Sequence, residues 1–255
     1  MLILFIQAFK AYFSVYRNLR IMIESGTKDI NILEEKIESL QREKAALQKI
    51  ISHDIRSPFN KIHALIQLMK MDGDTLTPDQ KEYLESMHVA VMSGLELVRN
   101  LHDARLIDEE KVDISKETAD LYMIANKAIN TFEDLAELKN IKINFVNNCK
   151  KAELLTDAHY LQRALENVLS NAIKYSYEDK PIIVTLERED NIYTIKVDDF
   201  GQGIRPEEVN LLFNKFQKLS AKATKGESST GLGLYLADYF IKRLGGEIFY
   251  RNEKK

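Results

Sequence analysis

The feature that most constrains this chain is an apolar repeat of helical period between residues 30 and 69. Apolar residues recur in steps of three and four, and charged residues fill most positions between them, as in a parallel coiled coil. Lys44 is a polar interruption of this apolar seam. The members of the seam are Ile30, Leu33, Ile37, Leu40, Leu47, Ile51, Ile55, Ile62, Ile66 and Met69. The pattern predicts a coiled-coil helix that runs without a break into a second helical segment.

The N-terminal residues 1–28 allow two interpretations. Their apolar and aromatic run is interrupted by polar residues and is shorter than the ~20 apolar residues that a membrane span needs. The order of charge and apolar residues is not that of a signal peptide. One interpretation is a juxtamembrane helix that contacts a membrane through residues 1–20. The other is the first turns of a dimer helix, and the sequence does not decide between them.

His53 is the first candidate reactive group. At about 100° per residue it lies about 200° from both Ile51 and Ile55, so we expect it to point away from the apolar seam and toward solvent. Asp54 follows it directly, and Pro58 removes the amide that would bond the carbonyl of Asp54, which predicts a loosened helix. An exposed imidazole can act as a nucleophile, and a neighbouring carboxylate can take its proton. The alternative is a solvated histidine on a helix surface.

A second long helix begins at Thr77. Pro78 follows it, and Gln80 stands three residues after the threonine, which is the pattern of a capping box with proline in the first turn. Two long helices joined by a short turn predict an antiparallel hairpin, and two such hairpins would close a four-helix bundle. We expect His88 and His102, both on this helix, to be surface or boundary residues.

Composition excludes several classes of protein. The chain has 255 residues, a formal net charge of −3 and a single cysteine, Cys149. An internal disulfide and a thiolate metal cluster are therefore impossible, which fits a reducing, cytoplasmic compartment. No basic surface dominates, so we expect no nucleic-acid partner.

From residue 111 onward, strand and helix patterns alternate. This order predicts an α+β fold, in which the helical hairpin is followed by a sandwich of a mixed sheet with helices on one face. The predicted strands are residues 141–146, 153–155, 181–186, 192–197 and 247–250, and the predicted helices are residues 121–135, 160–175 and 232–244.

Three polar residues share one face of the predicted helix 160–175. Asn167, Asn171 and Lys174 are spaced by four and three residues. Carboxamide oxygens suit Mg²⁺, and a lysine suits phosphate. The alternative is that the two asparagines cap local backbone groups.

Two glycine-containing turns follow. Asp199 comes directly after a strand, and Gly201 and Gly203 would let the backbone approach a flat ligand whose amine the carboxylate could bind. Gly231 and Gly233 open a helix whose first amides would face an anion. Between the turns, Phe213 and Phe216 border residues 217–229, a stretch with the composition of a mobile lid; ordinary core packing is the alternative for these aromatic residues.

The order of these segments resembles the H, N, G1, F, G2 and G3 boxes of bacterial two-component sensor histidine kinases. The resemblance covers roughly residues 44–250. The matching segments are SHDIRSP at 52–58, LENVLSNAIKY at 165–175, DFGQGI at 199–204, LLFNKF at 211–216, TGLGL at 230–234 and the glycine pair at 245–246.

The resemblance implies ATP-dependent autophosphorylation of His53 and transfer of the phosphoryl group to an aspartate of a response regulator. Asp54 would assist proton removal, and Asn171 would be the main Mg²⁺ ligand with Asn167 beside it. Ser57 stands four residues after His53, where the family often has Thr or Asn for a phosphatase reaction. The positions implied to bind ATP are Asn167, Asn171, Lys174, Tyr175, Asp199, Gly201, Gly203, Phe216, Thr230, Gly231, Leu232, Gly233 and Leu234.

The implied partners are a second copy of the chain and the receiver domain of a response regulator. The expected divisions are an apolar helix at 1–28, a coiled-coil signalling helix at 29–47, a dimerisation and phosphotransfer domain at 48–110, and an ATP-binding domain at 111–255 that lacks the family's usual last strand. We expect a cytoplasmic catalytic portion, with attachment to the inner face of the membrane left open.

Two alternatives to phosphoryl transfer follow from the ATP-binding half alone. The first is an ATPase of the group that contains gyrase, mismatch-repair and chaperone ATPases. Those carry a water-activating glutamate where this chain has Asn167, which favours transfer over hydrolysis. The second is a dimeric scaffold that binds ATP without transferring phosphate.

Overall fold

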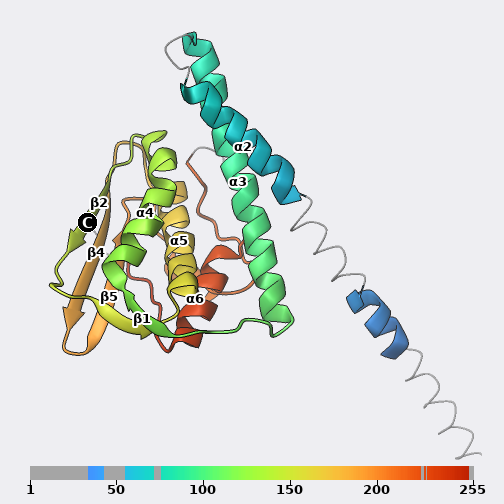
Figure 1. The fold of residues 1–255 in the computed structure, drawn as a ribbon, viewed down its shortest axis with the longest axis vertical. Coiled ribbons are helices and arrows are strands. Elements are labelled where there is room, and N and C mark those ends of the chain that lie inside the picture. The colour runs from blue at the N-terminus through green and yellow to red at the C-terminus, as the bar shows by residue number, and fades with distance from the viewer. Residues whose placement is uncertain (1–33, 43–54, 72–75, 225–226, 228, 253–255) are drawn as a thin grey trace, which may run out of the picture. The chain divides into compact units, whose positions relative to one another are not determined.

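The computed structural model describes residues 34–42, 55–71, 76–224, 227 and 229–252 (Figure 1). The chain divides into two compact units, residues 1–50 and residues 51–255. In the first unit, residues 34–42 form an exposed helix, in which Arg42 and Glu38 pair at 2.7 Å. The predicted apolar helix at 1–28, most of the coiled coil, and both His53 and Asp54 lie outside the described residues.

The second unit begins with the predicted helical hairpin. Its helices are α2 (Arg56–Met71) and α3 (Pro78–Asp108). The capping box at the start of α3 is confirmed, because the Thr77 hydroxyl accepts from the Gln80 amide at 3.3 Å and the Gln80 side chain accepts from the Thr77 amide at 2.9 Å. This satisfies two helix-end donors that would otherwise lack partners.

The hairpin is closed by an apolar cluster of Ile66, Leu84, Val91 and Leu95. Gly94 makes room for the ring of Phe59, since a Cβ at this position would lie 2.4 Å from a ring carbon. Other members of the predicted apolar seam are exposed within one chain. Within the second unit they are Ile55, Ile62 and Met69, at 38%, 44% and 47% exposure.

The predicted surface or boundary position of His88 was wrong. His88 is 1% exposed, its Nδ1 lies 3.0 Å from the Lys70 Nζ, and its ring stacks on His63 at 5.5 Å. The sequence explains this burial. His88 follows Leu84 by four residues and precedes Val91 by three, so it lies on the buried face of α3. His102 is partly buried, as a boundary residue should be.

The sheets of the second unit have mixed connectivity. In the larger sheet β2 (Ile143–Asn147) runs parallel to β4 (Ile182–Glu189), and β4 pairs antiparallel with β5 (Ile192–Asp198). A second sheet pairs β1 (Glu117–Asp120) antiparallel with β3 (Glu153–Thr156). The hairpin predicted across residues 189–191 is the β4–β5 turn. Strand β1 was not predicted from the sequence.

Three helices complete this part of the chain: α4 (Leu121–Glu137), α5 (Ala158–Tyr175) and α6 (Gly233–Leu244). Asp120 caps α4 and Asp157 caps α5, each by accepting main-chain N–H groups of the first turn. Figure 1 shows α4 and α5 side by side on one face of the larger sheet. The predicted α+β arrangement, with helices on one face of a mixed sheet, is confirmed.

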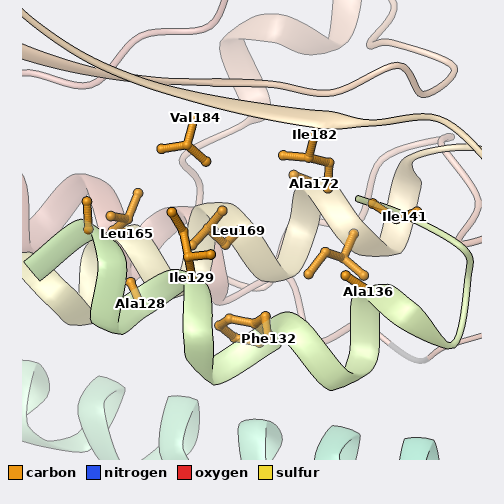
Figure 2. Packing of buried hydrophobic residues seen from close by; sticks show 12 residues of the cluster. Ala128, Ile129, Phe132, Ala136, Ile141, Leu165, Leu169, Ala172, Ile182 and Val184 are labelled. Carbon is orange, nitrogen blue, oxygen red and sulfur yellow. The ribbon is translucent and has the colours of Figure 1, made fainter. Parts of the chain in front are cut away.

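The main core lies between this sheet and α4 and α5. Figure 2 shows Ile182 and Val184 pointing from β4 toward the helices, where Leu169 and Ala172 of α5 meet them. Residues of β4 alternate between buried and partly exposed as far as position 187, which is the period-two pattern of a strand with one covered face. The core therefore fixes α5, the helix on which the predicted polar face lies.

The predicted strand at residues 247–250 does not form. Side chains rather than a strand ladder hold this segment, since the Tyr250 hydroxyl accepts from the Ile204 amide at 3.0 Å and the Asn252 side chain donates to the Ile204 carbonyl at 3.4 Å. The connection after β5 contains a 3₁₀ helix, Pro206–Leu211. Within the described ranges, no helix is both long enough and apolar enough to cross a membrane.

Candidate functional site

The site is built around the polar face of α5 and the start of α6. The expectation that Asn167 and Asn171 share a face is confirmed, and both lie opposite Gly233. A Cβ on Gly233 would lie 3.5 Å from the Asn167 Oδ1 and 3.6 Å from the Asn171 Nδ2. The Nδ2 of Asn167 is buried and has no hydrogen-bond partner. An unpaired buried amide donor is costly, so this group is suited to an incoming acceptor.

The first turn of α6 adds main-chain donors to the same place. Its N-cap residue, Leu232, makes no side-chain cap hydrogen bond. The first N–H groups of an α-helix have no partner within the helix, and together with the positive end of the helix dipole they favour an anion here. Together with the unpartnered amide of Asn167, they form a set of groups that can bind phosphate.

The turn before α6 depends on a glycine. Gly231 has φ +69°, and a Cβ here would lie 2.5 Å from the Gln217 carbonyl oxygen and 2.7 Å from the Phe216 carbonyl carbon. Thr230 accepts the Leu232 amide at 3.3 Å. Leu232 as a whole residue is 0% exposed and belongs to a core cluster, so its side chain packs in the core and not against a ligand.

The other glycine turn lies against the end of α5. Asp199 accepts the Gly201 amide at 2.9 Å, and a Cβ on Gly201 would lie 2.3 Å from the Tyr175 carbonyl oxygen. Gly201 also forms an isolated β-bridge with Ser176. The backbone of Gly201 therefore lies against the Tyr175 carbonyl and next to the Asp199 carboxylate, while the adenine-binding role that the resemblance implies for Asp199 stays a prediction. Gly203 adopts φ +69° in the same turn.

Lys174 has a protein partner that the sequence did not predict. Its Nζ lies 2.8 Å from a carboxylate oxygen of Glu96 on α3, and the Ser170 hydroxyl donates to the other oxygen at 2.7 Å. The lysine expected to contact phosphate therefore holds a carboxylate in this structure. Local sequence patterns could not show this pair, because the two residues lie 78 positions apart.

A second ion pair of α5 involves the glutamate next to Asn167. Glu166 is 5% exposed and pairs with Arg163 at 2.7 Å. Arg163 also pairs with Asp103 of α3 at 2.6 Å. Because Glu166 neutralises a buried guanidinium, it is poorly placed to take a proton from water.

Core packing is the wrong interpretation for Phe216. Its side chain is 60% exposed and its φ is +62°. Lys215 lies over the Phe216 ring at 5.4 Å and pairs with Asp108 at the end of α3 at 2.7 Å. An exposed ring at the border of residues 217–229 is available to a ligand.

The remaining predicted site positions are Ser57, Leu234, His53 and Asp54. Ser57 is exposed in the first turn of α2. Leu234 is partly exposed in the first turn of α6. The positions of His53 and Asp54 relative to the α5–α6 site belong to the undescribed part of the chain.

Two family models match the chain. Residues 43–110 match the His Kinase A (phospho-acceptor) domain, and residues 156–255 match the histidine kinase-, DNA gyrase B-, and HSP90-like ATPase family. Among curated relatives, the chain is 27% identical over 206 residues to the sensor protein SrrB of Staphylococcus aureus, which covers 80% of this chain and 35% of that protein. The chain thus spans about a third of the length of this relative.

Solved structures show the same fold. The Acinetobacter baumannii histidine kinase AdeS aligns with a TM-score of 0.51 at 21% identity, covering 79% of this chain and 91% of that one. Full-length ShkA in complex with AMPPNP aligns with a TM-score of 0.53 at 24% identity, covering 78% of this chain and 41% of that one.

Proposed function

Because the chain belongs to the two-component sensor histidine kinases, we propose that it binds ATP at the α5–α6 site and phosphorylates itself on His53. The phosphoryl group would then pass to an aspartate of a response regulator. The observation that carries the proposal is the convergence of Asn167, Asn171 and the start of α6 around Gly233. The similarity to ShkA, which was solved with an ATP analogue, supports the choice of ligand.

The residues at the site fit a magnesium-bound nucleotide. Asn171 and Asn167 present carboxamide groups toward the position that a side chain on Gly233 would fill. We infer that the carboxamide oxygens of Asn171 and Asn167 would hold Mg²⁺. The bound ion would neutralise phosphate charge. The unpartnered amide donor of Asn167 and the first N–H groups of α6 would bind phosphate oxygens. Asp199 would accept from the adenine amine.

The proposed transfer step is the one that the family resemblance implies for His53 and Asp54. An imidazole nitrogen would attack the γ-phosphorus, the bond from phosphorus to the β–γ bridging oxygen would break, and ADP would leave. Asp54 would accept the imidazole proton. In the second reaction a carboxylate of the regulator would attack the same phosphorus, the bond from phosphorus to the imidazole nitrogen would break, and the leaving imidazole would become neutral by regaining a proton. The chain's contribution is positioning and charge stabilisation, as for other phosphoryl transfers.

Dimerisation through the hairpin is part of the proposal. Several apolar side chains of α2 and α3 are exposed in the single chain, including Leu65 and Leu68 at 60% each and Tyr83 at 64%. A second hairpin would cover these side chains in a four-helix bundle. Light scattering should give a mass of two 29.4 kDa chains, and a monomer at micromolar concentration would contradict this. The receiver domain of the regulator would dock on the same bundle.

The alternative functions are weaker but testable. Hydrolysis needs a base that activates water, and the ion pair with Arg163 disfavours Glu166 in that role.

Phosphatase action on the regulator would use Ser57, which is exposed on α2. Ser57→Ala should then slow dephosphorylation of the regulator and leave autophosphorylation unchanged. A scaffold that binds ATP without transfer would show binding and no phosphohistidine.

The proposed ligand is tested by titrating the full chain with AMPPNP, with and without Mg²⁺, by calorimetry. We expect Mg²⁺-dependent binding that weakens at least tenfold in Asn171→Ala. Asn191→Ala is the matched control, because Asn191 is exposed in the β4–β5 turn. Equal binding by both variants would overturn the placement of the nucleotide at α5 and α6.

A further inference from the structure

A buried lysine lies behind the proposed nucleotide site. Lys139 follows α4 and is only 4% exposed. Its Nζ donates to the Ile173 carbonyl at 2.9 Å and the Lys174 carbonyl at 3.3 Å. It also donates to the Thr224 hydroxyl at 2.9 Å and pairs with Glu227 at 2.5 Å. Burying an ammonium is unfavourable unless partners compensate its lost hydration, and here such partners surround it.

Two of these partners belong to the last turn of α5. The carbonyls at a helix C-terminus lack partners within the helix, and a cation there is favoured by the helix dipole. Lys139 therefore caps α5 from the core side. The same turn carries Lys174 and Tyr175, which are proposed to contact the nucleotide. Fixing the carbonyls of this turn limits where those side chains can reach.

The other partners belong to the segment between Phe216 and Gly231. The Thr224 amide donates to the Lys174 carbonyl at 3.0 Å, and its hydroxyl lies 3.1 Å from the Ser176 carbonyl. Glu227 has a side chain only 7% exposed, and its contact with Lys139 neutralises part of its charge. Both residues are therefore held against the end of α5 at the same ammonium.

We propose that Lys139 is a positioning residue for nucleotide binding, which joins Thr224 and Glu227 to the end of α5. It lies behind the site and acts through its partners. Without the ammonium, the Ile173 and Lys174 carbonyls, the Thr224 hydroxyl and the Glu227 carboxylate would lose the cation that they share. That loss would loosen the contact of Thr224 and Glu227 with the last turn of α5, which carries Lys174 and Tyr175. The inference rests on the proposed nucleotide site.

The test compares Lys139→Met, Glu227→Gln and the double variant in the full chain, with AMPPNP and Mg²⁺ as the probe. We expect each single variant to raise Kd at least fivefold, and the double variant to bind no more weakly than Lys139→Met, because the two groups act as one unit. Lys139→Arg keeps the charge and should recover part of the affinity. Lys142→Met, at an exposed lysine nearby, is the control and should bind as the wild type does.

A second readout separates positioning from general stability. Without nucleotide, amides of residues 217–224 should exchange with deuterium faster in Lys139→Met, while those of β4 keep their protection. If Lys139→Met does not fold, Glu227→Gln alone must show both the faster exchange and the weaker binding. Wild-type affinity in a folded Lys139→Met, or additive losses in the double variant, would overturn the inference. No binding by the wild type would instead refute the proposed function itself.

Discussion

Replacing Glu96 should strengthen nucleotide binding. Glu96 and Lys174 pair at 2.8 Å, and their side chains are 21% and 14% exposed. If Lys174 binds phosphate, the incoming nucleotide must displace this carboxylate. Glu96→Gln keeps an acceptor for the Ser170 hydroxyl, so it removes the charge while preserving most of the packing.

The expected gain in nucleotide affinity can be worked out from the ion pair between Glu96 and Lys174. Two unit charges about 4 Å apart attract by about 4 kcal/mol at an effective dielectric constant of about 20. Desolvation cancels much of this, and hydrogen bonds to charged groups contribute a net ~1.5–3 kcal/mol. Since glutamine retains part of the bond, we expect a gain of about 1–2 kcal/mol, which is about 5- to 30-fold in Kd.

The assay is calorimetric titration of wild type and Glu96→Gln with AMPPNP and Mg²⁺. Glu85→Gln on the same helix is the matched control, because Glu85 is exposed, and its Kd should not change. The Kd of Glu96→Gln should fall while its unfolding temperature falls slightly. An unchanged or higher Kd in this variant would refute the competition between Glu96 and phosphate for Lys174.

Three further predictions concern other contacts. Gly231→Ala should abolish AMPPNP binding in calorimetry, because alanine is strained at φ +69° and its Cβ would meet the Gln217 carbonyl; wild-type affinity would contradict this. Burial, and then the charges of Lys70 and His63, lower the pKa of His88, so the folded state binds fewer protons than the unfolded state. Stability from His88 is therefore present above about pH 6.5 and is lost as pH falls below it. Urea midpoints from pH 7.5 to 5.5 should fall less in His88→Gln than in the wild type, and equal slopes would contradict the assignment. Glu166→Gln should leave the slow release of free phosphate from ATP unchanged in a colorimetric assay, whereas a base for hydrolysis would lose at least tenfold.

Sequence patterns correctly predicted the elements that depend on interactions between residues close together in the sequence. The capping box spans only the four residues from Thr77 to Gln80, and it formed as expected. The spacing of Asn167 and Asn171 placed both side chains on one helix face, where the structure brings them opposite Gly233. Strands β4 and β5 were predicted because a polar turn separates two runs of strand-forming residues.

Other features depend on contacts between distant parts of the chain, and single-sequence patterns do not encode them. Glu96 looks like an ordinary solvated residue of an amphipathic helix, yet it holds Lys174 of α5. Lys139 follows a helix end, where a solvated lysine is usual, yet it is buried. Residues 247–250 have the composition of a strand, but side-chain hydrogen bonds of Tyr250 and Asn252 hold the segment near Ile204.

The most direct test of the central claim is the chemical identity of the phosphorylated residue. The full chain is incubated with Mg²⁺ and γ-labelled ATP, with His53→Gln in parallel, and the label is tested in acid and in alkali. Label that is lost in acid, stable in alkali and absent from His53→Gln is the predicted result. Label that persists in His53→Gln, or binding of ATP with no label on the wild-type chain, would contradict transfer from the α5–α6 site to His53.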